Sequence, residues 1–199
     1  MAEEHELTDE MIAGRRSDTS MLPDDMPRWM AGAITGIDAL NGIVGRIVSW
    51  FIVVIMGAMI YEVVARYVFT SPTIWAYDTS RMFCGAAFVL GGGYALAKGV
   101  HIRSDFLYRN WSVKTQGRVD TLLYLVFFFP TMLLLLWISG DWAWRAVSQS
   151  ERSIDTTWAP LLGPIKSSLP FGILFLTIQG ISELLKSVYA ATRGRWPNA

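Results

Sequence analysis

Residues 62–105, EVVARYVFTSPTIWAYDTSRMFCGAAFVLGGGYALAKGVHIRSD, decide the fold of this chain. Within them one apolar segment ends at Glu62 and Arg66, the chain turns at Ser71-Pro72, and a second apolar segment leads to Lys98. Proline has a fixed φ and the residue before it avoids the helical region, so Ser71-Pro72 separates two helices. Two apolar segments with charges at the turn and at the exit predict a pair of membrane-spanning helices.

The rest of the chain repeats this pattern. Hydrophobic residues make up 52% of the sequence and charged residues only 17%. With its flanking turns, each of four uncharged runs reaches the roughly 20 residues that a bilayer requires. The sequence therefore predicts an all-α polytopic membrane protein with four transmembrane helices plus interfacial amphipathic helices. The runs are residues 47–61, 82–97, 121–140 and 167–182.

The expected domain organisation has a membrane domain between two tails. Residues 1–26 are acidic and lack an apolar core, which predicts a disordered cytoplasmic tail, with docking to a cytoplasmic partner as the alternative. The four-helix membrane domain is expected over 27–190, and a basic cytoplasmic tail over 191–199. Within the domain, apolar residues recur at steps of three and four over 27–46, which predicts an amphipathic lead-in helix.

Charge in the loops predicts the orientation. The connection between the second and third runs carries five basic residues against Asp105, whereas the other two connections are poorer in charge or balanced. The positive-inside rule then places this connection and both termini in the cytoplasm. Basic and apolar residues alternate over 101–118, which predicts an interfacial helix. Its candidate contact residues are His101, Arg103, Asp105 and Arg109.

The charges at the 62–105 turn form the first candidate site. Glu62 and Arg66 are four residues apart and share a helix face. Ionisable groups near membrane depth are costly unless they are paired, so they indicate either a structural charge cluster or a contact with another subunit. The proposed set is Glu62, Arg66, Trp75, Asp78 and Arg81.

Two other features indicate contact surfaces. Small residues in the second run predict a close-packing face at Gly85, Gly91, Gly92 and Gly93, because they allow helices to approach. The connection over 149–166 is long and contains prolines and aromatic residues, so it is either a docking surface outside the membrane or an ordered connector. Its candidate docking residues are Glu151, Arg152 and Trp158.

Several classes of chemistry find no support in the sequence. The only cysteine is Cys84, and the two histidines are His5 in the tail and His101 at an interface, so thiol exchange and bis-histidine haem are disfavoured. No phosphate loop or nucleophile-and-base motif occurs. The net charge of zero gives no attraction to nucleic acid. We expect no catalytic residue, metal ligand or cofactor, and no enzyme activity.

The hairpin resembles the small membrane subunit of TRAP (tripartite ATP-independent periplasmic) transporters, the DctQ type. The resemblance is specific between residues 62 and 107 and diffuse elsewhere. It rests on Arg66-Tyr67-Val68-Phe69, Pro72, Trp75, Asp78, Ser80-Arg81, Gly93-Tyr94-Ala95-Leu96, His101-Ile102-Arg103 and Asp105.

This resemblance implies a sodium-driven uptake system in the bacterial inner membrane. In such a system a periplasmic binding protein transiently delivers an organic anion to a large membrane subunit, which the small subunit braces. The implied partners are therefore the large subunit, the binding protein and membrane lipid. The alternative is a self-sufficient small transporter or channel that oligomerises to form a pore.

Overall fold

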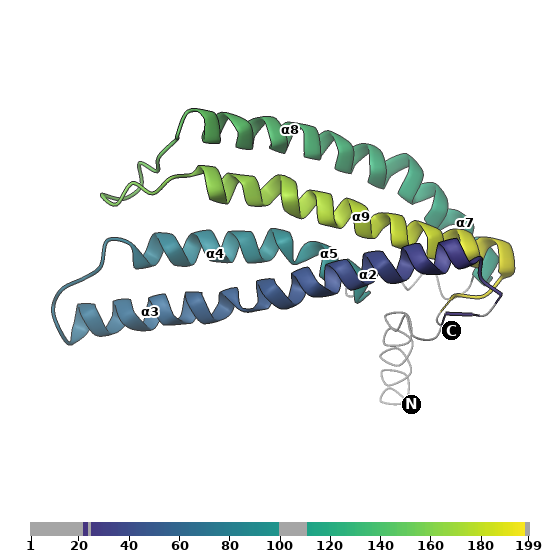
Figure 1. Cartoon of the computed structure of the whole chain (residues 1–199), viewed down its shortest axis with the longest axis horizontal. Helices are drawn as coiled ribbons and strands as arrows, with labels where there is room; N and C mark the ends of the chain where they lie inside the picture. Colours follow the sequence, from purple (N-terminus) through teal and green to yellow (C-terminus); the bar gives the residue numbers. More distant parts are fainter. Residues whose placement is uncertain (1–21, 24, 100–110, 198–199) are drawn as a thin grey trace. The chain divides into compact units, whose positions relative to one another are not determined.

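A computed structural model describes residues 22–23, 25–99 and 111–197, and the regular structure in these residues is helical. Their one strand-like pairing is an isolated antiparallel bridge between Arg152 and Leu161. The all-α class predicted from the sequence is confirmed. The helices are α2 (Arg28–Ser49), α3 (Phe51–Tyr67), α4 (Ala76–Leu90), α5 (Gly92–Ala97), α7 (Val113–Leu123), α8 (Phe129–Ser148) and α9 (Gly163–Arg193), as Figure 1 shows.

Three helical stretches of the described residues are long and apolar enough to span a bilayer: Arg28–Tyr67, Val113–Ser148 and Gly163–Arg193. They contain the first, third and fourth expected spans. The expected second span differs, because it is divided at Gly91 into α4 of 15 residues and α5 of 6 residues. Neither helix alone reaches the roughly 20 residues that cross the hydrocarbon. A fourth crossing by α4 and α5 together stays a prediction.

The third span contains a local irregularity just before Pro130. A π-helical turn, Tyr124–Phe128, joins α7 to α8. Proline lacks the N–H that would bond the carbonyl four residues earlier, and a π turn is one way in which a helix accommodates such a break. α7 itself begins after Ser112, whose hydroxyl accepts from the backbone N–H of Thr115. Residues 113–118, expected within the interfacial helix, are therefore the first turns of this longer helix.

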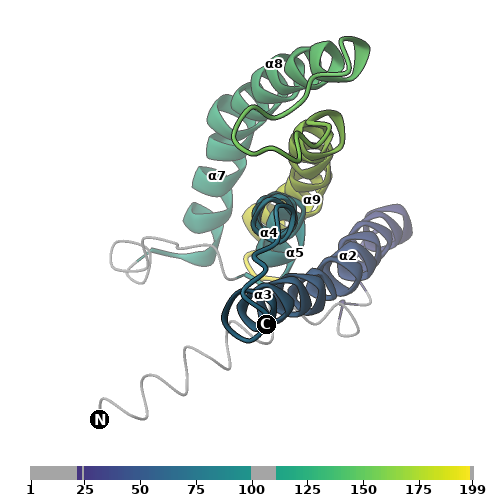
Figure 2. The ribbon, with the colours of Figure 1, turned by 90° about the vertical axis from the view of Figure 1, so that its left-hand side faces the viewer.

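The chain divides into two compact units. The hairpin unit comprises residues 43–92 and 134–175. In it, Phe51 on α3 meets Phe83 on α4 edge to face, with ring centroids 5.0 Å apart. The backbone of Gly172 on α9 lies against Val89 of α4, and that of Gly163 lies against Val147 of α8. Within this unit the helices thus follow the order α8, α9, α4, α3 (Figures 1 and 2).

The termini unit comprises the described residues within 1–42, 93–133 and 176–199. Its core joins α2 and the segment before it to α9 through Met26, Met30, Ile34 and Tyr189. α7 lies against α9 where Gly117 meets the backbone of Ala191. In this unit α2 packs on α9 through apolar side chains, and α7 packs on α9 through Gly117.

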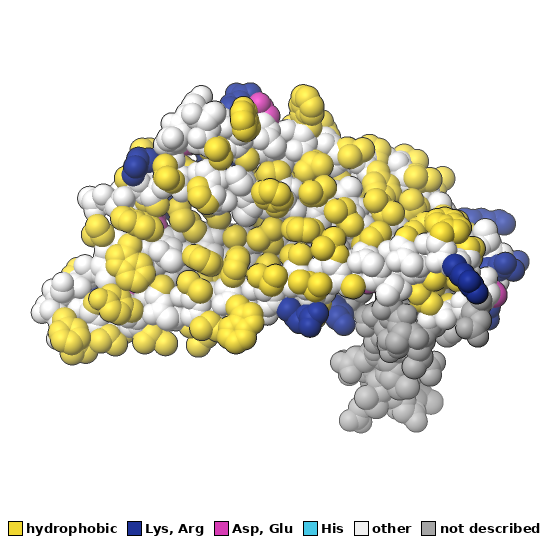
Figure 3. All heavy atoms as spheres, in the orientation of Figure 1, with side chains coloured by type: hydrophobic (Ala, Val, Ile, Leu, Met, Phe, Trp, Pro, Cys, Tyr) yellow, Lys and Arg dark blue, Asp and Glu magenta, His cyan; other side chains and the backbone are white. Residues whose placement is uncertain are grey.

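The surface of α3 is apolar. Ala58 and Glu62 are the buried residues of this helix, and its exposed side chains are mostly Ile, Val, Met and Tyr. On the face drawn in Figure 3, hydrophobic side chains run along α3 at the lower left. An exposed apolar helix is expected where lipid or another membrane subunit replaces water.

Candidate functional site

Glu62 fixes the C-terminal end of α3 to the turn that leads into α4. Its side chain is only 9% exposed. One carboxylate oxygen, Oε1, accepts from Arg66 Nε at 2.8 Å and also from Nη2. The other, Oε2, accepts from the Thr73 backbone N–H at 2.8 Å and also from the Thr73 hydroxyl. Both oxygens are therefore occupied by donors of the same chain, and Glu62 sets the path of the turn.

The first turns of α4 hold the connection between α8 and α9. Asp78 is fully buried, and its Oδ2 accepts from the Thr156 hydroxyl. Arg81 Nη2 lies 3.5 Å from Asp78 Oδ1 and donates to Asp155 Oδ2 at 2.7 Å. We call Asp78, Arg81, Asp155 and Thr156 the loop latch. It joins residues that are more than 70 positions apart in the chain.

The charge cluster expected from the sequence is thus two separate groups. Glu62 pairs with Arg66, and Asp78 pairs with Arg81, but the described residues show no ion pair between the two groups. Trp75 lies beside Tyr61 of α3, with ring centroids 5.7 Å apart. These contacts are internal to the hairpin unit, and a role of the cluster in contacting a partner stays a prediction.

The connection over 149–162 is closed by its own backbone. Leu162 N–H donates to the Glu151 carbonyl at 2.8 Å, and Ser153 N–H donates to the Pro160 carbonyl at 2.9 Å. Ser150 and Ala159 have positive φ, 48° and 44°, in the region that reverses chain direction at a steric cost. The loop is therefore a defined turn, which the prolines and aromatic residues of the sequence could not specify.

The three expected docking residues occupy different places in this loop. Glu151 accepts from Lys166 Nζ at 2.6 Å, and Arg152 Nη1 donates to the Ala159 carbonyl at 3.2 Å. Trp158 is 40% exposed. Sequence analysis did not identify Ile154, which is 98% exposed and lies between Ser153 and the latch residue Asp155. The two charged docking residues stabilise the loop, and the apolar ones present its surface.

The expected close-packing glycines lie in different surroundings. A Cβ added at Gly85 would lie 3.8 Å from Ile165 of α9, an ordinary contact, and one added at Gly92 would meet nothing within 4 Å. Gly91 separates α4 from α5, and Gly93 is buried at the start of α5. A closer approach of α4 to α9 than that at Gly85 occurs at Gly172, where an added Cβ would lie 2.6 Å from the Val89 carbonyl oxygen. Sequence analysis missed this glycine because it lies outside the small-residue run.

A buried polar network in the termini unit was also missed. Lys186 on α9 donates to Asp38 Oδ2 on α2 at 2.9 Å and to Glu183 Oε1 at 2.8 Å. Asp38 Oδ1 accepts from Gln179 Nε2 at 2.7 Å and from the Ser182 hydroxyl at 2.8 Å. The signal was available, because Gln179, Ser182 and Lys186 recur at helical spacing on one face of an apolar helix. Ionisable groups buried in this way require partners, and here α2 supplies one.

The ends of the described chain meet in the same unit. Asp25 accepts from the Tyr189 hydroxyl at 2.8 Å and pairs with Arg195. These contacts lower the pKa of the Asp25 carboxyl, the Tyr189 hydrogen bond most strongly. Trp196 is buried and donates to Gln116 Oε1 at 3.3 Å. Residues 195–196, expected within a tail, thus contact α7 and the segment before α2. The expected interfacial contacts at His101, Arg103, Asp105 and Arg109 lie outside the described residues.

In the described residues, no group of three His, Cys, Asp or Glu side chains is placed to hold a metal ion. The buried carboxylates described above accept hydrogen bonds from Arg, Lys, Thr, Ser and Gln instead. These carboxylates therefore connect helices to one another and to loops.

We expect Glu62→Gln to destabilise the hairpin unit more than Arg66→Gln does. A glutamine has one acceptor oxygen and one NH₂ group. The NH₂ group is a donor, and it would face the donors of either Arg66 or Thr73 without forming a hydrogen bond. Arg66→Gln removes a side chain that is 53% exposed and leaves Thr73 bonded. The midpoint of thermal unfolding in mild detergent measures the difference. Equal midpoints for Glu62→Gln and the wild type would show that Glu62 does not hold the turn.

The loop latch gives a second prediction, on pH. The hydrogen bond and charge of Arg81 lower the pKa of the Asp155 carboxyl below its ordinary value of 3.8. A depressed native pKa stabilises the closed loop above the unfolded-state pKa, and the stabilisation is lost as pH falls through the native value. We therefore expect hydrogen exchange in residues 151–162, corrected for its intrinsic pH dependence, to be constant between about pH 5 and about pH 8.

The matched variant is Asp155→Asn, which removes the charge and keeps the shape. It should exchange faster than the wild type near neutral pH, and the two should converge in acid. A change in the exchange rate of the wild-type loop near neutral pH would show that a titratable group other than Asp155 controls the loop.

A family model described as "Tripartite ATP-independent periplasmic transporters, DctQ component" matches residues 55–189. The match covers more than half of the chain and includes Glu62, the loop latch and the polar face of α9. No curated protein and no solved structure matches the chain.

Proposed function

We propose, from the premise that this chain belongs to the DctQ family of tripartite ATP-independent periplasmic transporter components, that it braces the large membrane subunit of its transporter. The family makes the chain the small membrane component of a TRAP transporter. The bracing role, the driving ion and the substrate class are proposals that go beyond the family match.

The family match carries this proposal, and the internal use of the charges supports it. Glu62 fixes the α3–α4 turn, and the loop latch fixes the α8–α9 connection to α4. A brace requires such fixed geometry, whereas a carrier requires a site that changes its accessibility. The exposed apolar surface of α3 is available to a membrane partner.

We further propose that the complex takes up organic anions with a sodium gradient across the bacterial inner membrane, with both termini of this chain in the cytoplasm. The 149–162 loop would then face the periplasm and contact the binding protein through Trp158 and Ile154. Its backbone closure supports this assignment, because a preformed loop loses little conformational entropy on binding. The chain itself would catalyse no reaction.

Uptake by cells that lack only this chain tests the proposal. We expect sodium-dependent uptake of labelled carboxylates to disappear and to return with the wild-type gene. Unchanged uptake without the chain would contradict the bracing role. Transport by the purified chain alone in liposomes would instead favour the oligomeric pore.

A further inference from the structure

One end of the termini unit carries basic side chains that the described chain leaves unpaired. Lys114 and Arg118 lie in the first two turns of α7, Arg193 ends α9 and Arg28 begins α2. All four are exposed, and none of their side chains has a hydrogen bond or an ion pair with the described residues. On the face drawn in Figure 3, dark blue side chains gather at this end. We call these four residues and Arg195 the basic end.

Packing brings the cations of α7 close to those at the end of α9. Lys114 lies against Gly194, because its Cε is 3.0 Å from the position of a Cβ added to that glycine. Arg193 and Arg195 flank Gly194 in the chain. Arg118 is one helical turn after Lys114, so the two share a face of α7. The basic end is therefore one surface built from two helices that pack on each other.

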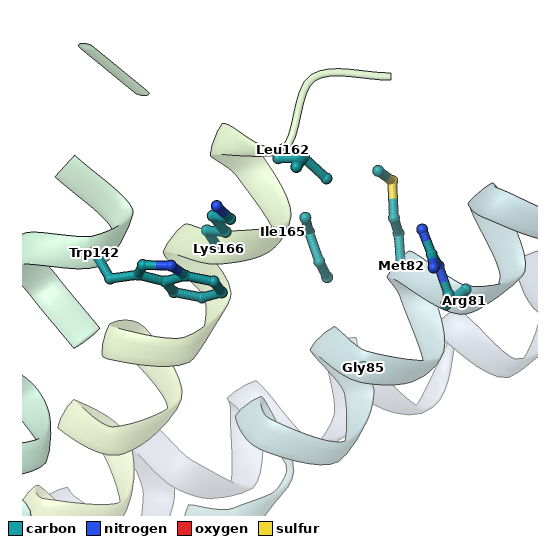
Figure 4. Close-up of a pocket in the computed structure, with 7 residues that line it drawn as sticks. All are labelled: Arg81, Met82, Gly85, Trp142, Leu162, Ile165 and Lys166. Carbon is teal, nitrogen blue, oxygen red and sulfur yellow. The ribbon is translucent and has the colours of Figure 1, made fainter. Parts of the chain in front are cut away.

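The charge of the basic end is not compensated within the described residues. Asp25 pairs with Arg195, and Asp120 is buried in α7. The four other cations have no carboxylate partner. The hairpin unit differs, because Arg81 and Lys166, drawn in Figure 4, pair with carboxylates of their own unit. The basic end therefore remains positively charged and open to an acidic partner.

The sequence contains a segment of opposite charge. Residues 1–12, MAEEHELTDEMI, have five acidic residues and neither Lys nor Arg. Blocks of like charge of this kind often act as interaction segments. We call residues 1–12 the acidic segment. Its carboxylates are those of Glu3, Glu4, Glu6, Asp9 and Glu10.

The acidic segment joins the described residues beside the basic end. Leu22 packs against the core cluster that contains Tyr189, and Tyr189 donates to Asp25, which pairs with Arg195. The intervening residues 13–21 can extend over roughly 30 Å. A helix with its side chains is about 10–12 Å across, and α2 and α7 both pack on α9. The acidic segment is therefore long enough to reach the cations of all three helices.

We propose that the acidic segment binds the basic end of the same chain, with its carboxylates on Lys114, Arg118 and Arg193. Tethering favours this segment over anionic lipid headgroups, because a short linker gives it an effective concentration in the mM range. The bound segment neutralises the basic end and covers it against other anionic partners. This contact lies within one chain and does not depend on the proposed bracing role.

Disulfide trapping in the purified chain tests the contact. Thr8→Cys is in the acidic segment, Thr192→Cys is beside Arg193, and Cys84→Ser removes the native thiol. The initial rate of intramolecular disulfide formation is measured in neutral detergent with copper phenanthroline and corrected for the labelling rate of each thiol by a neutral maleimide. We expect the rate to fall about tenfold between about 0.05 M and about 0.5 M salt, because exposed ion pairs are weak and screened. A rate independent of salt would overturn the proposal.

Charge variants on each side assign the effect to this contact. Arg118→Glu lies on α7, which carries neither new cysteine, and should lower the rate at low salt about fivefold. Arg145→Glu makes the same charge change in the hairpin unit and should leave the rate within about twofold. An equal fall in both variants would trace the effect to net charge and contradict the proposal.

The change on the acidic side combines Glu3→Gln, Glu4→Gln and Glu6→Gln. These substitutions alter no described helix, so they cannot act through the packing of α7 on α9. They should lower the rate at low salt about as far as high salt does. An unchanged rate would show that the carboxylates do not hold the segment.

Anionic headgroups are the rival occupant, because lipids of this kind attract basic clusters next to a membrane. The wild-type pair of cysteines is therefore also trapped in phosphatidylcholine bilayers with and without phosphatidylglycerol. We expect equal rates in the two bilayers. A fall in phosphatidylglycerol to the rate of the Arg118→Glu variant would assign the basic end to lipid and contradict the proposal. Uptake by the assembled transporter does not enter this readout, so failure here leaves the proposed function untouched.

Discussion

We expect Asp38→Leu to lower the free energy of unfolding by about 3 kcal/mol, because it removes the acceptor that three buried donors of α9 share. Lys186, whose side chain is 5% exposed, would keep only Glu183, and Gln179 and Ser182 would lose their acceptor. For a chain of this size the midpoint of thermal unfolding should fall by about 6–12 °C. Unfolding in mild detergent, followed by circular dichroism, measures the change.

The control for this prediction is Asp141→Asn. Asp141 pairs with Arg145 four residues away, but both side chains are at least half exposed. Exposed pairs of this kind contribute about 0.3–0.5 kcal/mol. Adding Lys186→Met to Asp38→Leu should increase the loss further, because it also removes the ammonium that pairs with Glu183. Equal effects of Asp38→Leu and Asp141→Asn would show that the network does not join α2 to α9.

The second large effect is expected at Gly117. A Cβ added there would lie 2.4 Å from the Ala191 backbone nitrogen and 2.7 Å from the Ser187 carbonyl oxygen. Backbone cannot move aside as a side chain can, so Gly117→Ala must push α7 away from α9. Overpacking of this kind costs about 1–3 kcal/mol, and the same unfolding assay measures it.

Gly36→Ala is the matched substitution in α2. A Cβ added at Gly36 would meet nothing within 4 Å, so the change should stabilise the helix by up to about 1 kcal/mol. We therefore expect Gly117→Ala to lower the free energy of unfolding and Gly36→Ala to raise it. Stabilisation by both would place α7 farther from α9 than the structure does.

The sequence predicted the helices well because their cause is local. Uncharged runs and the Ser71-Pro72 break indicated α3, α4, α8 and α9, and the four-residue spacing indicated the pair Glu62 and Arg66. Helix ends were less predictable. α9 begins at Gly163 and carries Pro170 in its interior, whereas the sequence favoured a start near Ser167.

The partners of the site residues could not be read from the sequence, because they come from distant positions. Asp78 bonds to Thr156, and Asp38 bonds to Lys186. No local spacing connects such residues, and only packing brings them together. The buried face of α9 is an exception, since its polar residues Gln179, Ser182 and Lys186 recur at helical spacing and indicate it from the sequence.

The central claim is that this chain assembles with a large membrane subunit, and co-purification tests it most directly. The tagged chain is expressed with its genomic neighbours, extracted in mild detergent and analysed for bound protein. We expect a much larger polytopic protein at about one copy per chain. Recovery of a homo-oligomer without that protein would contradict the account and favour the pore.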